Sequence, residues 1–441
     1  MKKRGIILLG LLLPGLLGLA QQRDQLTLEQ CYQLGEANYP LTRQRELIGR
    51  TRDYTIANIA KGIYPQLAVS GSATYQSDVT KIAIPPIGGI NVNIPTVPKD
   101  QYKLYGEVSQ TLTDFGINKQ RRVISRTDAE LQDANLSADL YALRDRINQL
   151  FFGVLLIDGQ LEQNELAAQD IRTGIARVQA AVKNGTDFTS SLNKLRAELL
   201  KTEQHSVELR ASRSAYTDML GLFVNRPLDS MTVLVRPEAP VAGNAGGVAG
   251  NVGAGLPSAD TIRRPELKAY DLQVQSYAEQ LRLTKLNLFP SVSAFFQGGV
   301  GQPNPMNFLS TSLSGYYLTG LRLTWTIGGS YTYKKDRLIS QNNQDIVKAQ
   351  RSTFLFNTSL TMQQENADIR KYRALVQSDE EIVRLRESVG KTSAVQLENG
   401  VISANDYLLD VNATAQARQD RVVHEMELLQ AQYNYKTTSG N

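Results

Sequence analysis

The side chains that could do chemistry in this chain are few and scattered. Its two histidines, His205 and His424, have no cysteine or second histidine at metal-ligand spacing, and both lie in polar stretches typical of solvated helix faces. The segment VGKTS at 389–393 resembles part of a phosphate-binding loop, but Leu385 stands where that motif needs glycine. No nucleophile has a base at a fitting spacing. We therefore expect a protein that is not an enzyme, with no cofactor and no metal site.

One pair of carboxylates has a spacing that favours a joint role. Asp406 and Asp410 are four residues apart in a helical pattern, so they share one face of that helix. On the outer face of a helix the same side chains would only be solvated, and both readings stay open at this point.

The first residues of the chain, its net charge and its single cysteine narrow the classes of protein to which it can belong. Residues 1–20 have a basic start, a Leu-rich run and small residues at the end, which predicts a signal peptide. Its removal would take away three basic residues and leave 45 (48 minus 3) against 43 acidic ones, so the charge does not indicate nucleic acid. The single cysteine, Cys31, cannot form an internal disulfide and is expected to be a small buried residue. No later segment is apolar for long enough to be a transmembrane helix.

Four stretches alternate between apolar and polar residues with a period of two, which predicts strands at about 66–76, 102–114, 291–301 and 316–328. Each has about the length of a tilted strand that crosses a bilayer. Their apolar side chains could contact lipid, while the polar set, with Lys103, Glu107 and Arg322, could line a wet lumen. Two hairpins of a soluble sandwich also fit the alternation. Four strands cannot close a barrel, so a membrane-spanning version needs several chains.

The rest of the chain is predicted to be helical. Apolar residues at heptad spacing indicate two very long helices, at 117–183 and 330–397. Shorter helices are expected at about 27–62, 188–221, 263–287 and 403–437.

These elements occur twice in the same order. Pro65 and Pro290, 225 residues apart, each end a helix before a strand, because proline can neither continue a helix nor pair in a central strand. Asn-Gly follows each long helix, at 184–185 and at 399–400. We therefore predict a first structural repeat at 21–239 and a second at 259–441, joined by a Gly-rich linker at 240–258.

This arrangement resembles the TolC-like outer-membrane efflux protein family over nearly the whole chain after the signal peptide. The residues that carry the resemblance are the two prolines, the glycines Gly116 and Gly329 between strand and helix, and the two Asn-Gly turns. It implies a mostly helical α+β fold in which three protomers give four strands each to one twelve-stranded outer-membrane β-barrel. That barrel would continue into a long periplasmic α-helical barrel, and Pro65 and Pro290 would mark the helix-to-strand transitions.

The resemblance also implies a function. The chain would be the passive duct of a tripartite efflux or type I secretion system in the outer membrane of a Gram-negative bacterium. Its expected partners are two further copies of itself, outer-membrane lipid, a periplasmic adaptor protein and an inner-membrane transporter, with no nucleic acid. The adaptor would contact the helical tips at Asn184, Gly185, Asn399, Gly400 and Ser403. The alternative is a secreted periplasmic coiled-coil protein with a structural or adaptor role.

The periplasmic aperture is the last expectation. Asp406 matches, by its spacing after the tip glycine, an aspartate that lines this entrance in family members, so Asp406 and Asp410 would form rings there. The polar latch of the family's best-known gate is absent, because its positions are Leu397, Ile402 and Ser191 here. We therefore expect closure to depend on helix packing at the tips.

Overall fold

The computed structural model describes residues 25–80, 96–229, 231–240, 262–307 and 310–441. The predicted signal peptide and residues 241–258 of the predicted linker lie outside these ranges. The chain forms two compact units. The sheet unit comprises Pro40–Ala142, Ala245–Gln364 and Lys436–Asn441, and the tip unit comprises Met1–Tyr39, Leu143–Asn244 and Glu365–Tyr435. Each unit therefore takes segments from both predicted repeats.

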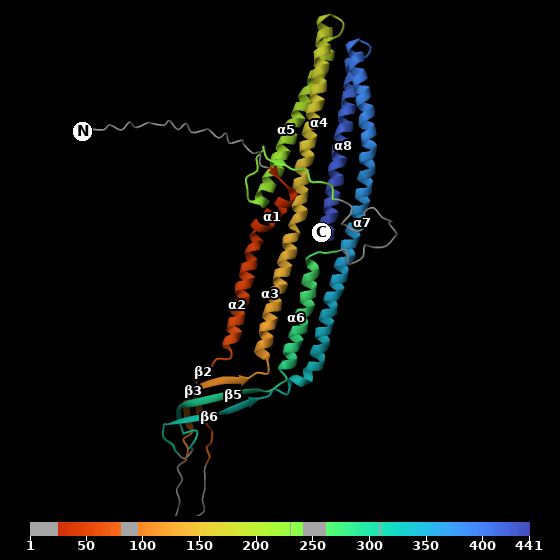
Figure 1. Ribbon diagram of the computed structural model, residues 1–441. Helices are drawn as coiled ribbons and strands as arrows, with labels where there is room; N and C mark the ends of the chain where they lie inside the picture. Colours follow the sequence, from red (N-terminus) through yellow and green to blue (C-terminus); the bar gives the residue numbers. More distant parts are fainter. Residues whose placement is uncertain (1–24, 81–95, 230, 241–261, 308–309) are drawn as a thin grey trace, which may run out of the picture. The chain divides into compact units, whose positions relative to one another are not determined.

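The sheet unit contains one antiparallel sheet of four strands in the order β2-β3-β5-β6 (Figure 1). The strands are β2 (Gln66–Tyr75), β3 (Asp100–Thr113), β5 (Ser291–Gln302) and β6 (Ser314–Thr324). The β3–β5 pair joins the two repeats, and Tyr105 lies opposite Gly299 in it. A Cβ atom at Gly299 would lie 2.2 Å from the carbonyl oxygen of Leu104, so only glycine fits this register.

The two faces of this sheet differ in chemistry. The register places Val69 next to Gly106, Gly298 and Tyr317 on one face, and this face continues along each strand with period two. Its apolar side chains are exposed, among them Leu67 (74%), Val69 (72%), Tyr317 (72%) and Leu321 (71%). The other face carries polar residues, and Arg322 donates to Glu107 across it at 2.8 Å. We call these the apolar face and the polar face.

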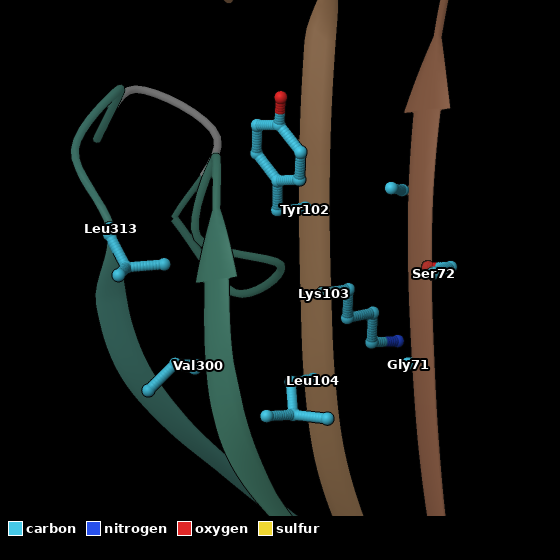
Figure 2. A pocket seen from close by; sticks show the side chains of 8 residues that line it. Gly71, Ser72, Tyr102, Lys103, Leu104, Val300 and Leu313 are labelled. Atoms are coloured by element: carbon cyan, nitrogen blue, oxygen red, sulfur yellow. The ribbon is translucent and has the colours of Figure 1, made fainter.

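A hollow lies on the apolar face (Figure 2). It measures about 430 Å³ and lies where the small residues Gly71 and Ala73 leave room beside Leu104 and Val300. Its lining is mostly apolar, which makes it part of the apolar face and no separate polar pocket.

Four helices of the sheet unit adjoin the strands. They are α2 (Arg43–Lys61), α3 (Ile117–Tyr141), α6 (Glu266–Leu286) and the first part of α7 (Gly329–Glu398). α3 packs against both α2 and α6 (Figure 1). Polar contacts fix the α3–α6 pair: Gln120 donates to the Glu279 carboxylate at 2.6 Å, and Ser276 donates to Asp128 at 2.8 Å.

The tip unit consists of helices and one small pair of strands. Its helices are α1 (Leu28–Asn38), α4 (Leu143–Lys183), α5 (Thr189–Val224), the last part of α7 and most of α8 (Ala404–Ser439). β1 (Gln25–Leu26) pairs in parallel with β4 (Val233–Leu234). Within the described residues no helix is both long and apolar enough to cross a membrane.

Two of the helices expected from sequence are interrupted. The helix predicted at 27–62 is divided into α1, a 3₁₀ turn at Pro40–Thr42 and α2. Pro40 is the physical cause, because proline has no N–H for the helical ladder. The helix predicted at 117–183 is divided at Ala142 into α3 and α4, where neither proline nor glycine stands. The predicted helix at 263–287 begins only after Pro265, at Glu266.

The core of the tip unit is aromatic and aliphatic around α4. Ile147, Phe151 and Phe152 are essentially inaccessible to solvent. Asn148 is buried among them and accepts a hydrogen bond from the Tyr32 hydroxyl, as a buried amide must. Cys31 is fully buried as predicted, and burial raises the pKa of its thiol to about 12, so it stays a neutral small side chain.

Candidate functional site

The two helical tips have the same backbone geometry. After α4, the amides of Gly185 and Thr186 donate to the carbonyls of Val182 and Ala181 at 3.1 and 2.9 Å. After α7, Gly400 and Val401 donate to Leu397 and Gln396 at 3.1 and 2.8 Å. Both patterns are Schellman caps, and both glycines have left-handed φ, +73° and +67°. The Asn-Gly pairs that the sequence marks as tips are therefore helix C-caps.

The polar residues after the two caps differ. At the second tip Ser403 caps α8: its hydroxyl accepts from the Asp406 amide at 3.2 Å, and the Asp406 carboxylate accepts from the Ser403 amide and hydroxyl at 3.2 and 2.7 Å. This is a reciprocal capping box. The first tip has Phe188 at the corresponding position, and there Asp187 accepts from Ser191 at 2.8 Å.

Asp406 is exposed, and its two hydrogen bonds from Ser403 hold the pKa of the carboxyl below its ordinary value. It therefore stays ionised well below neutral pH. Asp410, one turn later, is half-buried and accepts a hydrogen bond from the buried Ser393 of α7. The two carboxylates lie one turn apart on α8 and have different hydrogen-bond partners, Ser403 for Asp406 and Ser393 for Asp410.

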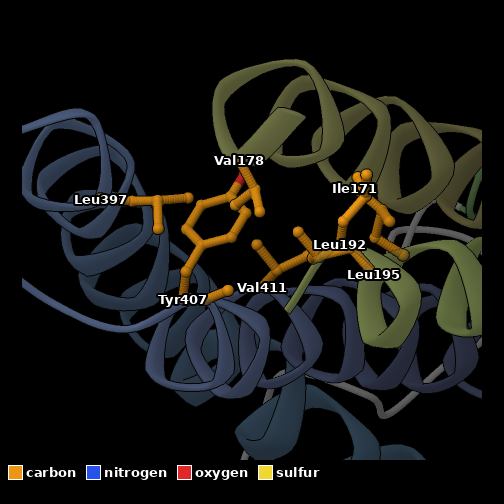
Figure 3. Packing of buried hydrophobic residues seen from close by; sticks show 8 residues of the cluster. Ile171, Val178, Leu192, Leu195, Leu397, Tyr407 and Val411 are labelled. Atoms are coloured by element: carbon orange, nitrogen blue, oxygen red, sulfur yellow. The ribbon is translucent and has the colours of Figure 1, made fainter. Parts of the chain in front are cut away.

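A hydrophobic cluster holds the two helical hairpins together just behind the tips (Figure 3). It draws on all four helices of the tip unit that reach them, α4, α5, α7 and α8. Tyr407 lies at its centre, and its ring packs where Gly174 has no side chain; a Cβ there would lie 2.4 Å from the ring. The buried members are Ile171, Val178, Leu192, Leu195, Leu397, Ala404, Tyr407 and Val411.

Leu397, Ile402 and Ser191, which stand where the polar latch of the family's best-known gate would be, lie in this cluster or next to one of its members in the chain. Leu397 is one of its buried members, and Ile402 packs against it. Ser191 is bonded to Asp187 within its own hairpin. Leu397 and Ile402 therefore make apolar contacts, whereas Ser191 makes a polar one, and closure by helix packing stays a prediction.

Sequence reasoning missed polar links between the hairpins. The Tyr407 hydroxyl donates to the Asp170 carbonyl at 2.9 Å, and Arg177 of α4 donates to the Ala394 carbonyl of α7. Arg418 of α8 contacts Asp170 and Glu387 at 3.3 and 3.0 Å. Partners so far apart in sequence carry no local signal, so only the packed helices reveal these links.

The prediction that both histidines are solvated is wrong for His424. Its ring lies 2.7 Å from the carboxylate of Asp379, which is itself buried, at the α7–α8 contact. His205 is exposed as predicted, beside Glu208 at 3.3 Å. No group of three or more metal-ligating side chains occurs among the described residues.

The helix-to-strand transitions lie in the sheet unit. Pro65 follows α2 and directly precedes β2, and Pro290 follows α6 and directly precedes β5. In both, the aromatic residue before the proline donates its amide to the end of the helix: Tyr64 to Lys61 at 3.0 Å and Phe289 to Leu286 at 3.1 Å. The two transitions thus share one hydrogen-bond pattern.

Solved structures share this architecture over almost the whole chain. VceC, an outer membrane protein of Vibrio cholerae, matches with a TM-score of 0.64 at 12% identity, covering 94% of this chain and 96% of its own. The outer-membrane channel OprN matches with a TM-score of 0.64 at 14% identity, covering 94% and 89%. The fold is that of the TolC-like outer-membrane channels.

The MtrE outer membrane channel of Neisseria gonorrhoeae, solved in its open state, is a further TolC-like match, with a TM-score of 0.63 at 14% identity over 94% of this chain and 89% of that one. No protein-family model matches the sequence, and no curated protein matches it. The resemblance to TolC-like channels predicted from sequence is confirmed at the level of the fold, and the solved proteins that share it are channels.

Proposed function

We propose that this chain is the outer-membrane duct of a tripartite efflux or type I secretion system and conducts substrates passively. The observation that carries the proposal is the four-stranded sheet, which exposes an apolar face on one side and a polar face on the other. Large apolar side chains in water are costly at roughly 25 cal/mol per Å² of exposed area. Lipid against the apolar face removes that cost, and the polar face then lines a wet lumen.

The free edges of the sheet support an oligomer. β2 and β6 are each paired on one side only within the described chain. Unpaired strand edges are not tolerated in hydrocarbon, so we infer that β6 of one chain pairs with β2 of the next. Two chains would supply eight strands and three would supply twelve, and the likeness to solved outer-membrane channels favours three.

The first expected outcome is a homotrimer in mild detergent. Mass photometry of the purified protein should give a single species of three chains that survives dilution. Chemical crosslinking should stop at the same size. A monomer or a dimer as the main species would contradict the proposed barrel.

Cell fractionation tests the duct against the alternative, a secreted periplasmic coiled-coil protein. The duct should stay with outer membranes and need detergent for extraction. Release by osmotic shock would favour the alternative, because that treatment frees soluble periplasmic proteins and leaves membrane-spanning ones behind.

The proposed partners are the proteins that a passive duct needs as its source of energy for export. Among the described residues we find no nucleotide-binding loop, so we propose that an inner-membrane transporter drives export and that a periplasmic adaptor joins it to the tips. The contact surface would consist of Asn184, Gly185, Asn399, Gly400 and Ser403. These residues are small or polar and follow helix ends, and nothing lies within 4 Å of a Cβ built at either glycine.

We propose that Asp406 and Asp410 set cation preference at the periplasmic aperture. In planar bilayers, Asp406→Asn should weaken cation selectivity and block by multivalent cations added on the periplasmic side. Asp410→Asn should have the smaller effect, because Asp410 is half-buried against Ser393 whereas Asp406 is exposed. Asn keeps the size of the side chain and can still accept from Ser403. Unchanged selectivity and block in the double variant would contradict the rings.

A further inference from the structure

Basic side chains gather where the helices of the sheet unit adjoin the strands. We define the basic collar as residues 57–61 of α2, 117–126 of α3, 281–286 of α6 and 329–338 of α7. Its only acidic residue is Asp336. α3 contributes Lys119, Arg121, Arg122 and Arg126, and α7 contributes Lys334, Lys335 and Arg337. The other two helices add Lys61, Arg282 and Lys285.

The collar cations have no acidic partners among the residues that the structure describes, although they are exposed or, for Arg122, half-buried. Several cations farther from the strands on the same helices are paired, such as Arg45 of α2 with Asp133 at 2.7 Å and Lys348 of α7 with Asp345 at 2.9 Å. The acidic residues near the collar are engaged by neutral donors instead. Glu279 accepts from Gln120 and Asp128 accepts from Ser276. The collar is therefore an uncompensated positive surface.

Part of this surface is concave. Lys119, Arg122 and Arg126 line a hollow of about 330 Å³ together with Val123. Three like charges around one hollow repel each other, and an anion placed there would relieve the repulsion.

An aromatic layer separates the collar from the strands. Tyr64, Phe115, Phe289 and Trp325 are exposed, and each lies between the end of a strand and the nearest helix. Phe115 stacks on Phe289 at 6.1 Å, and the Trp325 indole donates to the Leu288 carbonyl at 3.0 Å. From strand to helix the chain thus passes from exposed apolar to aromatic to basic side chains. That order matches the hydrocarbon, interface and headgroup layers of a membrane.

We propose that the basic collar binds the phosphate groups of anionic phospholipids in the membrane leaflet that faces the helices. This rests on the proposed function, since it takes the apolar face to lie in lipid. Lysine and arginine near a membrane surface are attracted to anionic lipid, and their long side chains reach along the interface while the stems stay on apolar surface. The ten residues of α3 in the collar span about 15 Å, which is within reach of the headgroup layer.

Native mass spectrometry of the detergent-purified oligomer tests the collar. Phosphatidylglycerol should bind roughly tenfold more tightly than phosphatidylcholine, since each cation near a surface adds attraction. In the variant K119Q/R121Q/R122Q/R126Q this preference should fall to about twofold or less. The matched control R43Q/R45Q/R50Q/R52Q removes four cations from the part of α2 away from the strands and should keep the full preference.

Three results would contradict lipid binding by the collar. They are equal binding of both lipids to the parent protein, an equal loss of lipid preference in variant and control, and displacement of phosphatidylglycerol by millimolar inorganic phosphate. Conductance in neutral phosphatidylcholine bilayers separates this inference from the proposed function. If the protein conducts but shows no lipid preference, the proposed lipid binding is wrong and the proposed duct stands. If the protein neither inserts into bilayers nor needs detergent for extraction, both the proposed lipid binding and the proposed duct are wrong.

Discussion

Val69→Arg should abolish assembly of this protein in the outer membrane, whereas Ser70→Arg should leave it nearly intact. The two residues are neighbours on β2 and point to opposite faces of the sheet. Val69 lies on the apolar face and is 72% exposed. A charged side chain at the lipid midplane costs about 2–4 kcal/mol in an outer-membrane barrel, and three copies in one barrel multiply that cost. An arginine at position 70 would point toward the polar face and stay solvated.

The measurement is the amount of trimer recovered from outer membranes for each variant at matched expression. The pair is informative because both changes add the same bulk and charge to the same exposed strand. In a soluble protein both positions would be open to water, and Val69→Arg would be as harmless as Ser70→Arg. Equal recovery of the two variants would therefore speak against a lipid-facing sheet.

Bulky residues at the second tip should stop export without preventing assembly. Gly400→Trp places the new side chain in open space, since nothing lies within 4 Å of a Cβ there. The left-handed φ of +67° costs a non-glycine residue about 1–2 kcal/mol, which the proposed trimer should tolerate. Ser403→Trp removes the side-chain cap of α8 at about 1 kcal/mol. In both variants the indole would occupy the surface that we propose meets the adaptor.

Export is best measured as resistance in cells that lack their own outer-membrane duct but carry the cognate pump and adaptor, with trimer quantified in parallel. Gly400→Asn is the control, because asparagine tolerates left-handed φ and is small. We expect full export with Gly400→Asn and almost none with Gly400→Trp, at equal trimer. Normal export with both tryptophan variants would place the adaptor contact elsewhere.

The sequence predicts the strands and tips because their signals are local. Period-two alternation requires only neighbouring residues, and it anticipated both faces of the sheet. Pro65 and Pro290 end helices through the missing N–H of proline, and Asn-Gly marks a Schellman cap. Each of these features is decided within a few residues, so no knowledge of tertiary packing is needed.

What the sequence did not reveal depends on helix packing. Arg418 meets Asp170 and Glu387 only because α4, α7 and α8 are adjacent in the tip unit. His424 looks solvated in its own helix, but Asp379 of α7 covers it. The capping role of Asp406 is an exception with a local signal, since Ser403 precedes it by the three residues of a capping box.

The pairing of β3 with β5 has a consequence for how such a chain could have evolved. Inside one chain this pair joins two equivalent hairpins, β2–β3 and β5–β6. In the proposed trimer the β6–β2 seam between chains would join the same kinds of strand. An ancestor of half the length could therefore have built the same wall from six identical copies. Gene fusion would then have freed the halves to diverge, which is how one tip could retain Phe188 where the other has Ser403.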